Sequence, residues 1–274
     1  MFRKSKSNTR DKDLDTVIEI LTAKSEVDSI LVLGSAKTTD FKPHSDIDLV
    51  VVLNEAVEPK LSSCFCYIGN NIGDVYFLYT DKIDELINSH ETLDAGSMEA
   101  KLVYWLTNGK IVCDNTNRLK RLKDKQIETR ISDSTKYAAW FRINYDYAHN
   151  LRMFRSKEAL YWQALEVRLL RCIFELFSYH IELRDPPWRG DKSAISYFSK
   201  NNPEFLSQFF ACIRADDLDK KFRLYSELVR DTLEDVGEVW DEQTTAVVPA
   251  ENYTSKIVES GIELWNRLTS PDGG

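Results

Sequence analysis

The chain has 274 residues, and its 36 Lys and Arg against 44 Asp and Glu give a formal net charge of −8 and a pI near 5.2. This acidic average disfavours a large electrostatic footprint for nucleic acid, so small-molecule substrates are favoured. The length suits two ordinary domains, each with its own core. Hydrophobic residues at 43% and charged residues at 29% are typical of a soluble globular protein.

The cysteines and the N-terminus bear on the cellular compartment. Five cysteines, an odd number, do not resemble a disulfide framework and predict reduced thiols in a cytoplasmic protein. Cys64 and Cys66 have the wrong spacing for a zinc site and are predicted to be strand residues. The basic N-terminus is not followed by an apolar segment, and no stretch approaches the ~20 apolar residues that span a bilayer. We expect no membrane insertion, whereas a homodimer is compatible with these features.

The first elements predicted are a helix and two strands. Apolar residues at helical spacing predict an amphipathic helix over residues 13–23. An apolar run over 30–33 ends at Gly34-Ser35, and after a polar link a second run covers 49–53. Asp46 and Asp48 open this second strand. Because side chains two apart on a strand share a face, the two carboxylates project together and the intervening Ile47 points the other way.

Two neighbouring carboxylates repel each other unless a cation lies between them. Oxygen ligands of this kind suit Mg²⁺, which keeps its remaining sites for water and substrate phosphates. Gly34-Ser35 supplies the complementary half, because a glycine lets the backbone approach a ligand and successive N–H groups at a turn bind anions. Asp46 and Asp48 are therefore candidate metal ligands, and Gly34 and Ser35 are candidate triphosphate ligands.

Gly-Ser, ten intervening residues and then Asp-Ile-Asp-Leu, following a β run, resembles the signature of the DNA polymerase β-like nucleotidyltransferase superfamily. This group includes aminoglycoside and lincosamide nucleotidyltransferases, minimal nucleotidyltransferases, and polymerases that extend RNA 3′ ends. The resemblance implies Mg²⁺ as cofactor and ATP, or another nucleoside triphosphate, as co-substrate. Many relatives have an arginine shortly after Gly-Ser; here Lys37 keeps the cation but lacks the planar guanidinium fork.

Further strands are predicted over 64–68 and 73–79, the second rich in aromatic and β-branched residues. Asp74, near its start, matches the third carboxylate of the superfamily and is the third candidate catalytic residue and metal ligand. Asp81 and Asp84 are rivals for this role, but their setting predicts the first turn of a helix.

Helices over 82–90 and 91–108, stopped by Gly109, and an edge strand over 110–113 complete the predicted first domain. The fold class is α+β: a mixed sheet of four or five strands with helices on one side, followed by an all-α helical bundle. We place the catalytic domain at 1–117 and the helical, acceptor-binding domain at 118–274.

The second domain shows long helical patterns, over 137–153 and 158–181 and in three further helices of which the last spans 253–268. The basic run over 118–125 predicts a solvated helical face, with contact to substrate phosphate or RNA as the alternative. In the loop over 185–192, Trp188 could stack on a base and Arg189 or Lys192 could reach a phosphate, or the loop is a rigid turn with Asp191 capping the next helix.

An αβ core followed by a helical bundle resembles antibiotic nucleotidyltransferases, and implies transfer of AMP to a hydroxyl of an aminoglycoside-like compound with release of pyrophosphate. Glu158 and Glu166 are candidate general bases. The alternative is a minimal nucleotidyltransferase fused to a HEPN-type helical domain that acts on RNA or protein. HEPN RNases carry an Arg, four to six residues, and then a His, and Arg142 and His149 meet this spacing.

Overall fold

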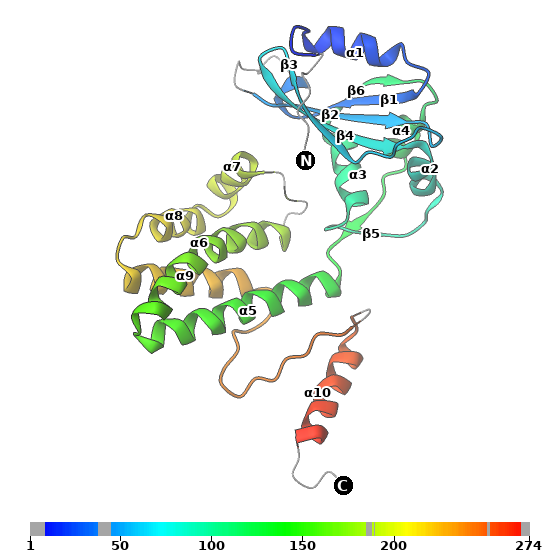
Figure 1. The fold of residues 1–274 in the computed structure, drawn as a ribbon. Helices are drawn as coiled ribbons and strands as arrows, with labels where there is room; N and C mark the ends of the chain where they lie inside the picture. The colour runs from blue at the N-terminus through cyan, green and yellow to red at the C-terminus, as the bar shows by residue number, and fades with distance from the viewer. Residues whose placement is uncertain (1–8, 38–44, 185–187, 189, 251–252, 270–274) are drawn as a thin grey trace. The chain divides into compact units, whose positions relative to one another are not determined.

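The computed structural model describes residues 9–37, 45–184, 188, 190–250 and 253–269, and the chain divides into two compact units, Met1–Arg130 and Ile131–Gly274. A mixed sheet with helices makes up the first unit and helices make up the second, so the α+β class is confirmed (Figure 1). Within the described residues, no helix is both long and apolar enough to cross a membrane.

The division follows Arg130 and not residue 117, because helix α4 (Arg118–Asp124) belongs to the first unit. Its Leu119 and Leu122 are 0% and 2% exposed and lie in the same core as strand residues of the sheet. The basic run that seemed to open the helical domain therefore completes the first one.

Five strands form the main sheet, in the order β3-β4-β2-β1-β6, with β2 and β4 parallel and the other neighbours antiparallel. They are β1 (Val27–Val32), β2 (Ile47–Leu53), β3 (Ser63–Ile68), β4 (Asn71–Tyr79) and β6 (Lys110–Asp114). Each corresponds to a predicted strand, and β6 lies at an edge as expected. Helix α3 (Met98–Asn108) is shorter than the helix predicted over 91–108, because Ser97 caps it by accepting a hydrogen bond from the Ala100 N–H. The residues before this cap include β5 (Leu93–Asp94), which pairs with β7 (Thr129–Arg130) in a second sheet.

Helices cover both faces of the sheet, so the prediction of helices on one side is wrong (Figure 1). Helix α1 (Leu14–Thr22) packs Val17 against one face, where Leu49 and Val51 of β2 lie. Helices α2 (Thr80–Asn88), α3 and α4 cover the other face, where Val50 and Val52 point. These four β2 residues are all 0% exposed. A continuous apolar run of this kind is typical of a central strand covered on both sides.

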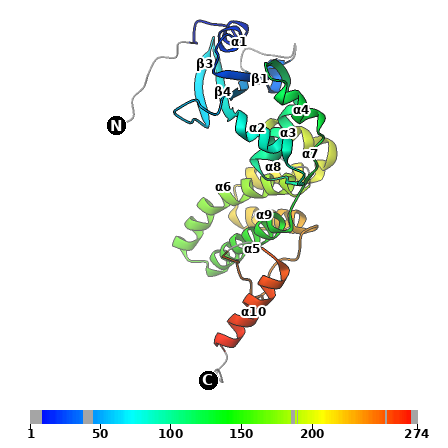
Figure 2. The same cartoon turned by 90° about the vertical axis from the view of Figure 1, so that its right-hand side faces the viewer.

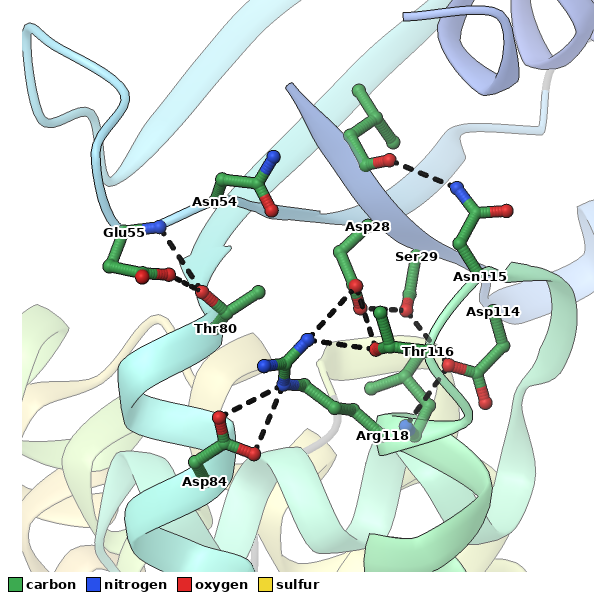
Figure 3. Close-up of polar contacts among 12 residues, drawn as sticks. Asp28, Ser29, Asn54, Glu55, Thr80, Asp84, Asp114, Asn115, Thr116 and Arg118 are labelled. Atoms are coloured by element: carbon green, nitrogen blue, oxygen red, sulfur yellow. Dashed lines mark hydrogen bonds and ion pairs between the residues drawn. The ribbon is translucent and has the colours of Figure 1, made fainter. Parts of the chain in front are cut away.

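An ionic network that includes the buried carboxylate of Asp28 joins α4 to the sheet (Figure 3). The Asp28 side chain on β1 is 2% exposed; it accepts from the Thr116 hydroxyl at 2.7 Å and pairs with Arg118 Nη1 at 3.2 Å. Arg118 Nε donates to both carboxylate oxygens of Asp84 at 3.0 Å. Arg118 is therefore a structural cation inside the first unit, and Asp84 is held by Arg118.

Lys125, at the end of the basic run, also differs from the prediction of a solvated helical face, because its side chain binds backbone carbonyls. Its ammonium group donates to the carbonyls of Leu86 and Ile87 at 3.1 and 2.6 Å, and to the Ser89 carbonyl, where α2 ends. A cation at a helix C-terminus satisfies the last carbonyls and complements the helix dipole. Lys125 thus ties the chain beyond α4 to the end of α2.

The second unit is helical as predicted, and α5, α6 and α9 pack against one another in it (Figure 2). Its helices are α5 (Asp133–Ser156), α6 (Ala159–Glu182), α7 (Asp191–Asn201), α8 (Pro203–Arg214), α9 (Leu218–Leu233) and α10 (Ser255–Thr269). Leu165, Leu169 and Ile173, spaced along one face of α6, are buried in the core. Pro203 starts α8 behind the capping side chain of Asn202, and Asp217 caps α9.

His180 on α6 predicts how the helical unit responds to acid. Burial, and then the nearby charge of Arg184, lower the pKa of His180 from 6.5 to about 3. Between these values the unfolded chain binds a proton that the folded chain does not, so the free energy of unfolding falls as the pH falls, by about 1.4 kcal/mol per pH unit. Urea unfolding at pH 7 and pH 5 should show a loss in the wild type that exceeds the loss in His180→Leu by up to about 2 kcal/mol. Equal losses in both proteins would contradict the assignment.

Candidate active site

The turn after β1 brings the backbone close to a β2 carboxylate. Gly34 begins a 3-10 turn (Gly34–Lys37) with φ of +59°, a conformation that favours glycine. A Cβ placed on Gly34 would lie 3.1 Å from Asp48 Oδ2, and the Leu33 N–H donates to the Asp48 carbonyl at 2.9 Å. Glycine is thus required here both for its φ and for the close approach. Ser35 and Lys37 share this turn through their backbone, while their side chains lie outside the part that the structure describes.

Asp48 and Asp74 lie side by side. Strands β2 and β4 are parallel and their register pairs Asp48 with Asp74, so the two side chains share one face of the sheet at adjacent positions. Both residues are half-buried. Asp46 precedes β2 by one residue and is exposed. The structure therefore brings Gly34, Asp48 and Asp74 together and puts Asp46 at the open end of the same strand.

Tyr76 is a neighbour of the two carboxylates that no sequence motif indicates. It follows Asp74 by two residues on the same face of β4, and its pKa is raised by burial and then by the charges of Asp48 and Asp74. Its ring centroid lies 5.0 Å from that of Trp105 on α3. Tyr76 therefore connects the carboxylates to the helix-covered core, a role that alternation along the strand alone does not reveal.

Asn71 is the first residue of β4. Its side-chain amide donates to the Ser45 carbonyl at 2.8 Å, directly before Asp46. This contact exists because β4 begins where β2 begins, as the parallel register requires. Asn71 thus anchors the segment that leads into the Asp46 position, and no local pattern in the sequence could have indicated its partner.

The donors at this site fit Mg²⁺, because Asp46, Asp48 and Asp74 all offer carboxylate oxygens and Gly34 leaves open the space that a Cβ would fill beside Asp48. Their ligand atoms do not all lie within 4.8 Å of one another: among the described residues, only Asp146, Cys172 and Glu175 of the helical unit do. Three guanidinium groups lie 2.6 to 3.2 Å from Asp146, which makes that cluster unsuited to a cation. A single Mg²⁺ ion held by all three carboxylates would require them to lie closer together, whereas Mg²⁺ bound by two carboxylates would complete its shell with water and phosphate oxygens.

The remaining candidates lie in the helical unit. Lys192 is exposed in the first turn of α7, where Gly190 occupies the capping position and Asp191 is the first helical residue. Trp188 packs edge-to-face against Phe177, at 5.9 Å between centroids, and so contributes to the helical core. Arg189 lies outside the described residues. The two glutamates proposed as general bases, Glu158 and Glu166, are both exposed at α6.

Arg142 and His149 lie on one face of α5, seven residues apart. Arg142 Nε pairs with Asp146 at 2.9 Å, and Arg142 Nη2 lies 3.9 Å from a Glu175 carboxylate oxygen. The His149 ring lies 4.5 Å from that of Tyr145, and burial lowers its pKa, as do the neighbouring arginines. Carboxylates thus engage Arg142, and a neutral ring at physiological pH is favoured for His149.

The comparisons with known proteins bear on the first unit. Residues 15–114 match the family described as "Polymerase beta, Nucleotidyltransferase". Residues 15–114 are a polymerase β nucleotidyltransferase domain. This domain runs from α1 to the end of β6, so it contains Gly34 and all three aspartates and excludes the helical unit. The chain therefore contains a nucleotidyltransferase domain.

Among solved structures, a nucleotidyltransferase-like protein from Exiguobacterium sibiricum matches with 12% sequence identity and a TM-score of 0.39, over 81% of this chain and 73% of that one. A similarity at this level supports no argument about fold or activity. No curated protein matches the chain. The nucleotidyltransferase assignment therefore rests on the domain itself.

Proposed function

We propose that the protein transfers AMP from ATP to a hydroxyl of a small-molecule acceptor, such as an aminoglycoside-like compound, in a Mg²⁺-dependent reaction that releases pyrophosphate. The observation that supports it is one row of groups across the sheet: Gly34 beside the Asp48 carboxylate, and Asp48 beside Asp74. An anion-binding turn next to paired carboxylates is what metal-assisted nucleotidyl transfer requires.

Each residue has a distinct role in this proposal. Asp46 and Asp48 would hold two Mg²⁺ ions, and Asp74 would hold the one on the acceptor side. Bound there, the ions would supply charge neutralisation for the attacking and leaving oxygens. The backbone N–H groups at Gly34 and Ser35 would hold the β- and γ-phosphates, and Lys37 would add a cation next to them. What the chain contributes is chiefly the placement of phosphates and hydroxyl before any bond changes.

The helical unit is assigned to the acceptor. The net charge of −8 favours a cationic small molecule over a polyanion. Lys192 is kept as an additional phosphate ligand, and Glu158 or Glu166 as a general base, within the same proposal.

The test is incubation with ATP radiolabelled at the α-phosphate, Mg²⁺ and four separate acceptor panels: aminoglycosides, lincosamides, tRNA and total protein. Labelled product is expected with a small molecule, and omission of Mg²⁺ should abolish it. Label found in tRNA or protein alone would contradict a small-molecule acceptor and would favour the alternative, in which the enzyme acts on RNA or protein. RNA cleavage that is lost in His149→Ala would support the HEPN-type alternative.

Gly34→Ala tests the triphosphate site. The new methyl group would lie 3.1 Å from Asp48 Oδ2, so we expect the KM for ATP to rise about tenfold or more while the KM for the acceptor changes little. Gly69→Ala is the matched control, because Gly69 has a similar φ of +56° and its Cβ would lie 3.4 Å from the Lys12 carbonyl, away from any carboxylate. Both variants should lose about 1 kcal/mol of folding free energy from the backbone conformation. A rise in the KM for the acceptor alone would contradict the assignment of Gly34 to the triphosphate site.

A further inference from the structure

Two aromatic residues on edge strand β3 extend the row of site groups. The antiparallel register pairs Phe65 with Asp74, so the Phe65 ring and the Asp74 carboxylate lie on the same face at directly opposite positions. Tyr67, two residues farther, shares this face and pairs with Ile72. Phe65 is 64% exposed, Tyr67 38% and Ile72 37%. An exposed apolar patch therefore adjoins the third carboxylate.

The strand order fixes which side of the site this patch occupies. From β1 through β2 and β4 to β3, the groups on the shared face follow the order Gly34, Asp48, Asp74, Phe65. Neighbouring strands are about 4.8 Å apart, so Phe65 lies roughly 10 Å from Asp48. The anion-binding turn is thus at one end of the row and the aromatic pair is at the other.

Phe65 and Tyr67 do not serve the core. Cys66 and Ile68 point to the opposite face, where they pack in the core under α1. The rings of Phe65 and Tyr67 instead lie edge to face at 6.0 Å, and the Arg10 guanidinium lies 5.2 Å from the Tyr67 ring. Aromatic rings exposed on a strand edge favour unwanted association, so their placement beside a catalytic carboxylate calls for a ligand.

We propose that Phe65 and Tyr67 form a stacking platform for the acceptor, which presents the flat face of a sugar ring or an aromatic base next to the hydroxyl that is modified. The platform rests on the proposed function, because that function assigns Asp74 to the acceptor side and Gly34 to the triphosphate. Stacking on an aromatic face tolerates different rings, since every planar or ring-shaped group offers a face. An open-chain acceptor without a ring would gain nothing from this platform.

The test compares the wild type with Phe65→Ala, Phe65→Tyr and Cys64→Ala. Cys64 is the control, because it is exposed on the same strand but points to the opposite face. Calorimetry in the presence of Mg²⁺ measures the Kd of the protein for a non-hydrolysable ATP analogue. Saturation-transfer NMR on the protein–analogue complex then measures the Kd for each of two ring-bearing probes, kanamycin and adenosine. These probes distinguish a sugar ring from an aromatic base.

We expect at least one probe to bind the wild type and Phe65→Ala to weaken it roughly 5- to 140-fold, the range of base–aromatic stacking. Phe65→Tyr should keep the affinity within a few-fold, Cys64→Ala should change nothing, and the analogue Kd should be the same in all four proteins.

Loss of analogue affinity in Phe65→Ala would put the nucleobase on the platform and overturn the proposal. Probe binding that is absent from the wild type, or unchanged in Phe65→Ala, would also overturn it, and a dimer dissociated by Phe65→Ala would identify an edge contact instead. Wild-type protein that fails to bind the analogue would refute the proposed function itself, and the platform with it.

Discussion

Asp48→Asn is expected to lower kcat for nucleotidyl transfer by about three orders of magnitude or more, which corresponds to at least ~4 kcal/mol of transition-state stabilisation. Asparagine keeps the shape of the side chain between Gly34 and Asp74 but removes the charge that would hold the metal. Single-turnover transfer of labelled AMP at saturating ATP measures the effect. The Mg²⁺ concentration dependence should shift strongly to higher values in the same variant.

Asp81→Asn is the matched control for that experiment. Asp81 lies in the same unit, in the first turn of α2, and is exposed. It should retain wild-type kcat, and circular dichroism should show the same fold for both variants. If Asp48→Asn kept its fold and transferred AMP at nearly the wild-type rate, the assignment of Asp48 as a metal ligand would be wrong. Asp46→Asn should behave like Asp48→Asn if Asp46, which is exposed and lies one residue before the strand, holds the same metal ions.

Arg118→Met is expected to destabilise the first unit by about 3 kcal/mol or more, because removal of one partner leaves the other charge buried. The Asp28 side chain, 2% exposed, would keep the hydrogen bonds from the Thr116 and Ser29 hydroxyl groups but lose its ion pair, and Asp84 would lose both of its bonds to Arg118. The free energy of unfolding by urea measures this loss. In Arg118→Met/Asp28→Asn, removal of the stranded charge should restore part of the stability.

Arg121→Met is the control on the same helix, since Arg121 is exposed and should change stability by less than about 0.5 kcal/mol. The affinity of folded Arg118→Met for Mg²⁺ and ATP should be unchanged. Asp28 lies near the start of β1 and Gly34 follows its end six residues later, about 20 Å along an extended strand. Equal stability of Arg118→Met and Arg121→Met would show that the ion pairs of Arg118 contribute little.

The sequence by itself determined the features that depend on neighbours along the chain. Alternation places Asp48 on one face of its strand and Leu49 on the other, and a period near 3.6 places Leu165 and Leu169 on one face of α6. Gly34-Ser35 at the end of an apolar run predicts a turn, and the φ of +59° at Gly34 agrees with this prediction. These signals are enough to predict five strands, the long helices, and the α+β class.

Only the tertiary structure decided which distant residues became neighbours. The parallel pairing of β2 with β4 puts Asp74 beside Asp48, and the pairing of β3 with β4 puts Phe65 beside Asp74, although nothing in the local pattern of either strand names its partner. The same holds for Arg118, whose partner Asp28 lies 90 residues away and whose helix looked like a solvated basic face. The periodicity of apolar residues predicts which face of a helix or strand is buried. Burial of apolar surface in three dimensions decides which element packs against that face. The ion pairs of a buried charged side chain depend on this packing.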